Sequence, residues 1–266
     1  MRKRTERIAE IIKMTTGLNV KANVIYKNNK IMYAITFFVK EGLGMNVYIN
    51  DMVEHTDEQI VREVIKIFKS HKNEDIPNFN TNEIIKRQYI LDHVIPCLVN
   101  KKGNEALLAN KPHISFFDME IVFRVICSED WSASYMLNDI QMEEENLNLK
   151  EVYNASLKNN GPVIKSFFGM TILTNEKNLY GASCILHKIT LESIAKQMEN
   201  DFYILPSSIH ETIIVPYNEN FPPSFLQDIV KEVNETEVDD DEILTNSVYL
   251  YNRFTKQISL VSLEEE

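Results

Sequence analysis

Apolar residues recur at helical spacing at two places in the first 70 residues of the chain. Ile8, Ile11 and Ile12 lie on one face of an otherwise charged N-terminal segment, which predicts a helix with that face against a core. Residues 56–59 have the spacing of a capping box, a Thr followed three positions later by a Gln, and apolar residues continue at helical period to Phe68. We therefore expect one helix at the N-terminus and a second that begins at this capping box.

Between these helices, β-branched and aromatic residues predict strands over 20–26, 31–39 and 44–49. The first two strands are separated by Asn28 and Asn29. The chain has only seven glycines, and Asn tolerates the left-handed backbone that a tight hairpin needs, so we expect a hairpin at this point. The pattern predicts a meander of antiparallel strands.

From residue 82 onward, single helices alternate with short strands. Helices are expected from about residue 82 to a stop at Pro96, and over 105–109, 147–157, 190–200 and 223–234. Strands are expected over 97–99, 116–127, 131–137, 170–173, 182–186, 202–205, 211–215, 248–251 and 257–263. Hairpins that alternate with single helices favour an α+β fold with mainly antiparallel sheets.

In the last two predicted strands, the alternation of residue types predicts which face of the hairpin is buried. This face is expected to consist of Val248, Leu250, Ile258 and Leu260, and the opposite face of Tyr249, Tyr251, Gln257 and Ser259.

The domain organisation is less sharply marked. The polar stretch over 71–81 and the break over 159–165 are the two plausible boundaries. We expect residues 1–75 to form an N-terminal helix, β-meander and helix, and residues 76–266 to form a larger α+β region. One continuous domain over 1–266 is the alternative.

Charge is distributed unevenly along an ordinary globular composition. Of the net charge of −11, residues 1–40 contribute +7 and residues 192–266 contribute −12. Sequence-independent binding of nucleic acid requires a cationic surface, so an acidic chain is a poor candidate for it. A polarised field of this kind steers association between macromolecules without specifying chemistry, which favours a protein as the partner.

The cysteines and the apolar runs indicate the compartment. Cys97, Cys127 and Cys184 are far apart and odd in number, which is typical of reduced thiols in a cytoplasm. We see no apolar run long enough for a signal peptide or a membrane span. A cytoplasmic protein without membrane contact is expected.

Six segments together resemble a known family. They read VYIND at 47–51, PHISFFDMEIVF at 112–123, LTNEKNLYGAS at 173–183, FYILPSSIHE at 202–211, VKEVNET at 230–236 and SVYLYNR at 247–253. In this order they resemble an uncharacterised family of Firmicutes, often encoded on phages and integrative elements and catalogued only as a domain of unknown function. The resemblance extends from about residue 20 to residue 260 and implies a bacterial cytoplasmic protein of mobile-element origin. It implies no known activity, cofactor or catalytic residue.

The densest polar cluster lies between two short strands, at 207–211. A Ser hydroxyl beside an imidazole could form a nucleophile–base pair oriented by a carboxylate. The candidates for such a set are Ser207, Ser208, His210, Glu211, Asp51 and Asp118. Consecutive strand residues point to opposite faces, which favours the other interpretation, a Pro-Ser-Ser turn in which His210 is hydrogen-bonded at the start of a strand.

Metal and cofactor sites are weakly indicated. The acidic run over 238–242 lacks the alternating acids and the mid-loop Gly of a calcium loop, and we expect it to cap a short helix that contains Ile243 and Leu244. A minority interpretation is a magnesium site formed by Asp239, Asp240 and Asp241. Neither a nucleotide-binding glycine pattern nor a zinc spacing occurs, so we expect no cofactor.

These observations lead to two hypotheses of different class. The first is a non-enzymatic interaction protein of the bacterial cytoplasm, accessory to a phage or integrative element, that binds another macromolecule. The alternative is a hydrolase or small-ligand-binding enzyme with a site around Ser207, His210 and Glu211. A concave pocket that holds His210 and an acid would favour the enzyme, and a flat acidic face would favour the binding protein.

Overall fold

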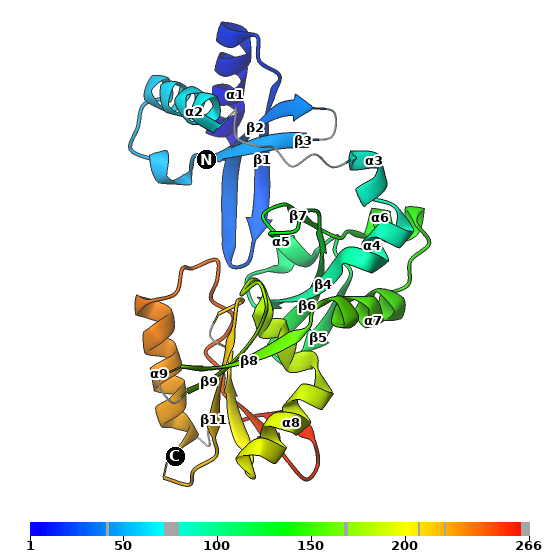
Figure 1. Cartoon of the computed structure of the whole chain (residues 1–266). Helices are drawn as coiled ribbons and strands as arrows, with labels where there is room; N and C mark the ends of the chain where they lie inside the picture. The colour runs from blue at the N-terminus through cyan, green and yellow to red at the C-terminus, as the bar shows by residue number, and fades with distance from the viewer. Residues whose placement is uncertain (41–42, 72–79, 168–169, 207, 221, 262–266) are drawn as a thin grey trace. The chain divides into compact units, whose positions relative to one another are not determined.

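A computed structural model describes residues 1–40, 43–71, 80–167, 170–206, 208–220 and 222–261 (Figure 1). The chain divides into two compact units, Met1–Ile84 and Ile85–Glu266. In the described parts of the chain, no helix is both long enough and apolar enough to cross a membrane.

The first unit is a three-stranded antiparallel sheet with two helices on one face (Figure 1). Its elements are α1 (Arg2–Thr16), β1 (Val20–Lys27), β2 (Lys30–Lys40), β3 (Leu43–Tyr48), the 3-10 helix η1 (Asn50–Met52), α2 (Asp57–His71) and α3 (Thr81–Ile84). The predicted order of helix, meander and helix is confirmed.

Local signals explain this agreement. Asn29 has a φ of 56° in the two-residue turn that pairs Lys27 with Lys30, so the left-handed position predicted for the hairpin is occupied by Asn. The capping box is formed, because Thr56 N donates to Gln59 Oε1 at 2.7 Å and Gln59 N donates to Thr56 Oγ1 at 3.3 Å.

The second unit contains two further antiparallel sheets. Its elements are α4 (Arg87–His93), β4 (Val94–Asn100), α5 (Glu105–Leu108), β5 (His113–Phe116), β6 (Met119–Ile126), β7 (Ser134–Met136), α6 (Asp139–Glu144), α7 (Leu149–Asn159), β8 (Pro162–Phe167), β9 (Met170–Asn175), the 3-10 helix η2 (Gly181–Leu186), α8 (Lys188–Met198), β10 (Phe202–Leu205), β11 (Thr212–Pro216), α9 (Pro223–Thr236), β12 (Tyr249–Asn252) and β13 (Gln257–Leu260). The sheet orders are β4-β6-β5, with β7 also paired to β6, and β13-β12-β10-β11-β9-β8. The expected α+β class with antiparallel hairpins and interspersed helices is confirmed.

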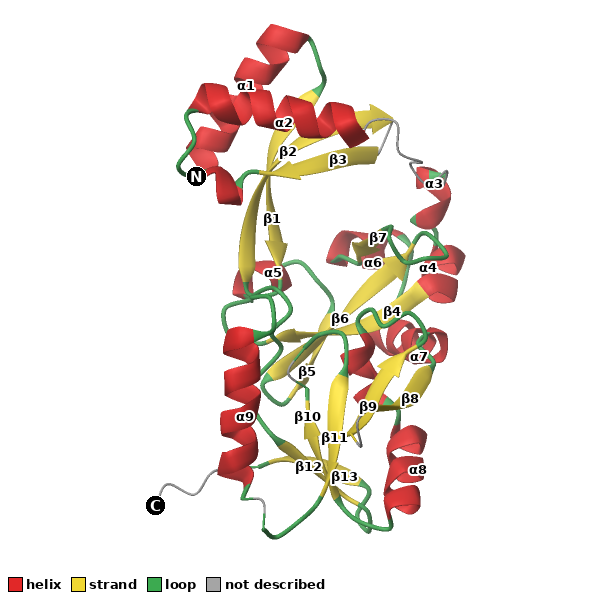
Figure 2. Cartoon of the chain, turned by 60° about the vertical axis from the view of Figure 1, so that its left-hand side comes forward, coloured by secondary structure: helices red, strands yellow, loops and turns green. Residues whose placement is uncertain are grey.

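The six-stranded sheet is covered on both faces (Figure 2). On one face, Leu226 and Val230 of α9 pack against Tyr203 and Val248. The other face belongs to the main core, which continues through η2 and α8 to the sheet of β4 to β7. A sheet that is buried on both faces carries apolar residues at successive positions, so alternation in these strands does not identify one buried side.

The C-terminal hairpin shows this effect. Tyr249 and Tyr251, which the alternation places on the exposed face, are 0% and 2% exposed in the main core. Leu260, expected to be buried, is 44% exposed opposite Tyr249. The two strands were placed correctly and Val248 is buried as predicted, but Tyr249 and Tyr251 were wrongly assigned to the exposed face and Leu260 to the buried one.

Two further predicted elements also differ from the structure. Residues 182–186 form part of η2 and not a strand, and all six residues of η2 are buried. A short apolar run does not distinguish a strand from a buried helical turn. The helix expected to run to Pro96 is divided into α3 and α4 and ends at His93, and Pro96 lies inside β4 opposite Phe123. Because β4 is an edge strand, the missing N–H of a proline is tolerated there.

Candidate functional site

The loop between β10 and β11 carries the polar cluster that the sequence singled out. Ser208 forms an isolated bridge to Ile243, and its hydroxyl accepts a hydrogen bond from the backbone N of His210 at 3.1 Å. The carbonyl of His210 accepts a hydrogen bond from Thr174 Oγ1 at 2.9 Å. Ser208 therefore binds the backbone of His210 and not its imidazole.

The imidazole of His210 bridges two other segments. Its Nδ1 accepts from the backbone N of Tyr180 at 3.2 Å, and its Nε2 lies 3.2 Å from Glu242 Oε1. A backbone N–H can only donate, so the neutral ring carries its proton on Nε2 and donates it to the carboxylate. Both ring nitrogens are thus engaged, and neither offers a free lone pair to a serine hydroxyl.

Close packing fixes the backbone beside this ring. Tyr180 has a φ of 58°, which is uncommon for an aromatic residue. A Cβ at Gly181 would lie 2.2 Å from Thr174 Oγ1 and 2.6 Å from the carbonyl oxygen of His210, so only glycine fits. The Arg124 guanidinium lies 4.7 Å from the centre of the Tyr180 ring. Glycines are few in this sequence, so Gly181 was the signal that could have indicated the close contact with Thr174 and His210.

None of the other predicted catalytic residues that the structure describes contacts the imidazole of His210. Ser207 lies outside the described residues. Glu211 is exposed, and the carboxylate that reaches the ring belongs to Glu242. Asp51 is exposed in η1 of the first unit. The sequence reasoning missed Glu242 as the partner of His210, although it ends the acidic run.

Asp118 lies in the turn between β5 and β6, where other side chains of the protein donate hydrogen bonds to its carboxylate. Its Oδ2 accepts from Thr245 Oγ1 at 2.5 Å and from Ser247 Oγ at 2.8 Å, and its Oδ1 accepts from the Tyr249 hydroxyl. Burial and this carboxylate raise the pKa of Tyr249. Asp118 thus attaches the segment before β12 to the β5–β6 turn.

The acidic run over 238–242 forms a turn and not the short helix we expected. Glu242 N and Ile243 N both donate to the carbonyl of Asp239, at 2.7 and 3.2 Å. Asp239 and Asp240 are exposed, and Asp241 is half-buried. Across the described ranges, no group of three or more His, Cys, Asp or Glu side chains is arranged to hold a metal ion.

All three cysteines are free thiols. Burial raises the pKa of Cys97 and of Cys184 to about 12 and that of Cys127 to about 11. These groups are protonated at neutral pH, and the thiol form is a poor nucleophile.

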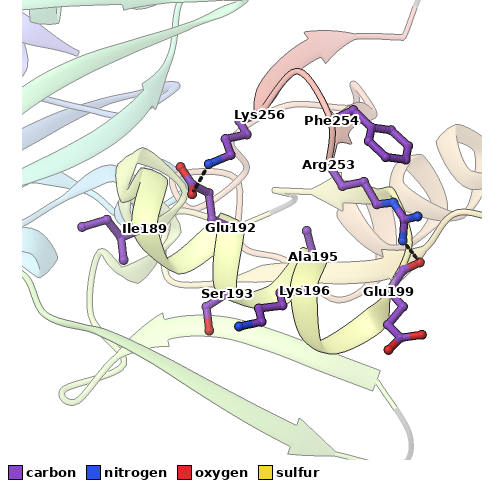
Figure 3. Close-up of a pocket in the computed structure, with 9 residues that line it drawn as sticks. All are labelled: Ile189, Glu192, Ser193, Ala195, Lys196, Glu199, Arg253, Phe254 and Lys256. Carbon is purple, nitrogen blue, oxygen red and sulfur yellow. Dashed lines mark hydrogen bonds and ion pairs between the residues drawn. The ribbon is translucent and has the colours of Figure 1, made fainter.

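A hollow of about 610 Å³ lies between α8 and the β12–β13 turn (Figure 3). We call it the α8 hollow; it is lined by Ile189, Glu192, Ser193, Ala195, Lys196, Glu199, Arg253, Phe254 and Lys256. Ile189 is 84% exposed and Phe254 is 78% exposed. The signal in the sequence that could have indicated this surface is Phe254, an aromatic residue inside an otherwise polar turn.

Hydrogen bonds fix the turn that carries Phe254. Asp201 Oδ1 accepts from Arg253 N at 2.9 Å. Asn252 Oδ1 accepts from Phe254 N at 3.1 Å and from Thr255 N at 2.8 Å. The backbone on which Phe254 is exposed is therefore held in one conformation.

The same turn is attached to α8. Lys256 Nζ lies 2.7 Å from Glu192 Oε2, and this carboxylate raises the pKa of Lys256. The Arg253 guanidinium donates to the carbonyl of Glu199 and stacks at 4.7 Å over the ring of Phe254, while the Glu199 carboxylate points away from it (Figure 3). The two walls of the α8 hollow are thus linked to each other.

The described residues define a mixed α+β protein whose sheets are antiparallel. By sequence, the chain belongs to DUF5688, a family of unknown function, whose profile matches residues 2–170 and 160–253. The expected membership in a family of unknown function is confirmed. Searches of curated proteins and of solved structures gave no significant match.

Proposed function

We propose that this protein acts without catalysis, by binding another protein through the α8 hollow. The observation that carries the proposal is the exposure of Ile189 and Phe254 on an ordered surface. Apolar residues that line a hollow with a polar rim are typical of protein interaction sites.

The geometry supports this proposal in two ways. Large side chains such as Phe254 and Ile189 can insert into a partner and exclude water, and a few such residues carry most of the energy of an interface. The hydrogen bonds of Asp201 and Asn252 hold the β12–β13 turn before binding, so little conformational entropy is lost when a partner docks.

The alternative of a hydrolase is less well supported. Ser208 binds a backbone group, and both nitrogens of His210 are engaged. The thiols are protonated at neutral pH because burial raises their pKa. None of the contacts of Ser208 and His210 favours a nucleophile–base pair at the predicted site.

We also propose that the protein belongs to the cytoplasm of a bacterium and is an accessory protein of a phage or integrative element. The three free thiols and the resemblance of the six segments support this origin. The genes next to those of family members provide the test. Integrase or phage genes should recur beside them, and random neighbours would contradict the mobile-element origin.

Photo-crosslinking tests the binding site. A photoreactive phenylalanine analogue replaces Phe254 in the full chain, and the protein is irradiated in a lysate of the bacterium that encodes it. The same analogue at Phe225, a 48% exposed aromatic residue on α9, is the matched control. We expect a discrete adduct from position 254 that is absent from position 225.

A second substitution checks that the adduct depends on the α8 hollow. Ile189→Asp should abolish the adduct, and Ile140→Asp, at a 66% exposed position on α6, should leave it unchanged. The same adducts from both photoreactive positions, or none from position 254, would show that the proposed site is wrong.

A further inference from the structure

A second hollow lies beside the α8 hollow and shares Lys256 with it. We call it the β5 groove; its volume is about 530 Å³, and its lining includes Ile114, Phe117, Tyr251, Ile258, Lys188 and Lys256. Phe117 is 40% exposed, and Ile114 and Ile258 are half-buried. The groove therefore presents apolar surface on its walls and amino groups on its rim.

The linings of the two hollows carry more basic than acidic side chains in an otherwise acidic unit. Residues 85–266 hold 15 Lys and Arg against 28 Asp and Glu. Residues 192–266 contain only four basic residues, and three of them, Lys196, Arg253 and Lys256, line the α8 hollow. Lys188 adds a fourth cation at the β5 groove.

Acidic neighbours cancel only part of this charge. Glu192 is occupied by Lys256, and the Glu199 carboxylate points away from the Arg253 guanidinium, which binds a neutral carbonyl (Figure 3). Lys188 and Lys196 are exposed on α8. The two hollows together therefore attract anionic groups, whereas the rest of the second unit repels them.

We propose that the two hollows bind a segment of a partner protein that combines carboxylate side chains with large apolar ones. The apolar side chains occupy the β5 groove and contact Ile189 and Phe254, and the carboxylates pair with Lys188, Lys196 and Arg253. This inference rests on the proposed function and adds to it the class of partner. A nucleic acid fits less well, because the apolar walls offer nothing to phosphates and the acidic surroundings repel a polyanion.

Binding of two short labelled peptides to the full chain tests the class of partner. Both peptides carry Leu and Phe at the same positions, and the remaining positions are Glu in one peptide and Lys in the other. We expect the acidic peptide to bind saturably, with fluorescence anisotropy that decreases as salt screens the charges, and the basic peptide not to bind. A labelled single-stranded oligonucleotide is the third probe, and we expect it not to bind.

Charge reversals locate the peptide. Lys188→Glu combined with Lys196→Glu should weaken binding of the acidic peptide by about tenfold or more. Lys231→Glu on α9 is the matched control, because Lys231 is the one basic residue of 192–266 outside the hollows, and it should leave the affinity unchanged. Thermal melts confirm that the variants are folded.

Three results would overturn the inference. They are equal binding of both peptides, binding of the oligonucleotide that is tighter than that of the acidic peptide, and a loss of affinity in the Lys231→Glu control equal to that in the double variant. Absence of peptide binding would overturn it as well. If the adduct at position 254 forms nevertheless, the protein-binding function stands and only the class of partner is wrong. If the adduct is also missing, the proposed function fails too.

Discussion

At the scale of single residues, the polar groups that resemble a catalytic set connect loops. His210 joins its own loop to Tyr180 and to Glu242, and Asp118 joins the β5–β6 turn to Tyr249. A half-buried polar group without a partner costs free energy, so each contact stabilises the loops that it connects. These side chains therefore contribute to the packing of the loops around them.

Substitution of His210 tests this structural role. The side-chain amide of Gln reaches the place of Nε2, so His210→Gln retains the contact with Glu242 and loses the acceptor for Tyr180 N. The shorter amide of Asn reaches the place of Nδ1, so His210→Asn retains the acceptor for Tyr180 N and loses the contact with Glu242. Each variant should remain folded and lose about 0.5–2 kcal/mol of unfolding free energy. Urea unfolding followed by the fluorescence of Trp131, the single tryptophan, measures this loss.

Glu211→Gln, at an exposed neighbour, is the control and should change stability by less than about 0.5 kcal/mol. Wild type and variants are also tested on generic esters and phosphodiesters. Turnover by the wild type that is missing in a stably folded His210→Gln protein would establish the hydrolase instead, because Gln cannot cycle a proton near neutral pH.

At the scale of elements, a carboxylate links the two helices of the first unit. Asp57, at the start of α2, accepts from Arg4 Nε at 2.9 Å and from Arg7 Nε at 2.5 Å, both on α1. The hydrogen bond from Arg4 and then those of Arg7 hold the pKa of Asp57 below its usual 3.8. The folded state therefore binds a proton less readily than the unfolded state does.

A pH dependence follows from this difference. The contribution of Asp57 to stability is complete above its usual pKa of 3.8 and is lost as the pH falls through the lower pKa of the folded state. Asp57→Asn should destabilise the first unit by about 0.2–1 kcal/mol at neutral pH, and the deficit should vanish in acid. Hydrogen exchange of α1 amides measures this, with Glu58→Gln as the control. A deficit that persists below the folded pKa would contradict the prediction.

How far the sequence predicts these elements depends on whether their signals are local. The Asn28–Asn29 turn and the Thr56 box each lie within a few residues, and both were predicted. The conformation of η2 depends on the close approach of Gly181 to the carbonyl of His210, which is distant in sequence. For the same reason, the candidate site was predicted only in part, since Glu242 reaches His210 through tertiary folding.

The C-terminal hairpin gives a prediction at this scale. Truncation after Asn246 removes Tyr249 and Tyr251, which are buried in the main core, and exposes the surface that they cover. The loss of this apolar burial should cost several kcal/mol and lower the melting temperature of the second unit. Leu260→Ser, at a 44% exposed position, should change it little. An unchanged Trp131 fluorescence melt after truncation would show that the hairpin is dispensable.

At the scale of the whole molecule, the two units differ in charge and have separate cores. Residues 1–84 hold 13 Lys and Arg against 11 Asp and Glu, a net charge of +2, whereas residues 85–266 carry −13. Among the described residues, the buried core of the first unit extends from Ile8 to Phe68. The proposed binding site lies entirely in the acidic second unit. Whether the N-terminal part is a separate domain, as expected, therefore depends on whether it folds without the larger region.

We predict that residues 1–84 fold without the rest of the chain. In the part of the chain that the structure describes, the buried apolar residues of this core come from α1, the meander, Ile49 before η1, and α2. The rings of Phe37 and Phe68 stack with their centroids 4.1 Å apart. The fragment should give dispersed amide NMR signals and a cooperative melt, of modest stability because a domain of this size buries a limited core. Phe37→Ala should lower its unfolding free energy by about 3–5 kcal/mol and so abolish the melt, whereas Met14→Ala, at an 85% exposed position, should not. A wild-type fragment that lacks a cooperative transition would show that the chain folds as one continuous domain.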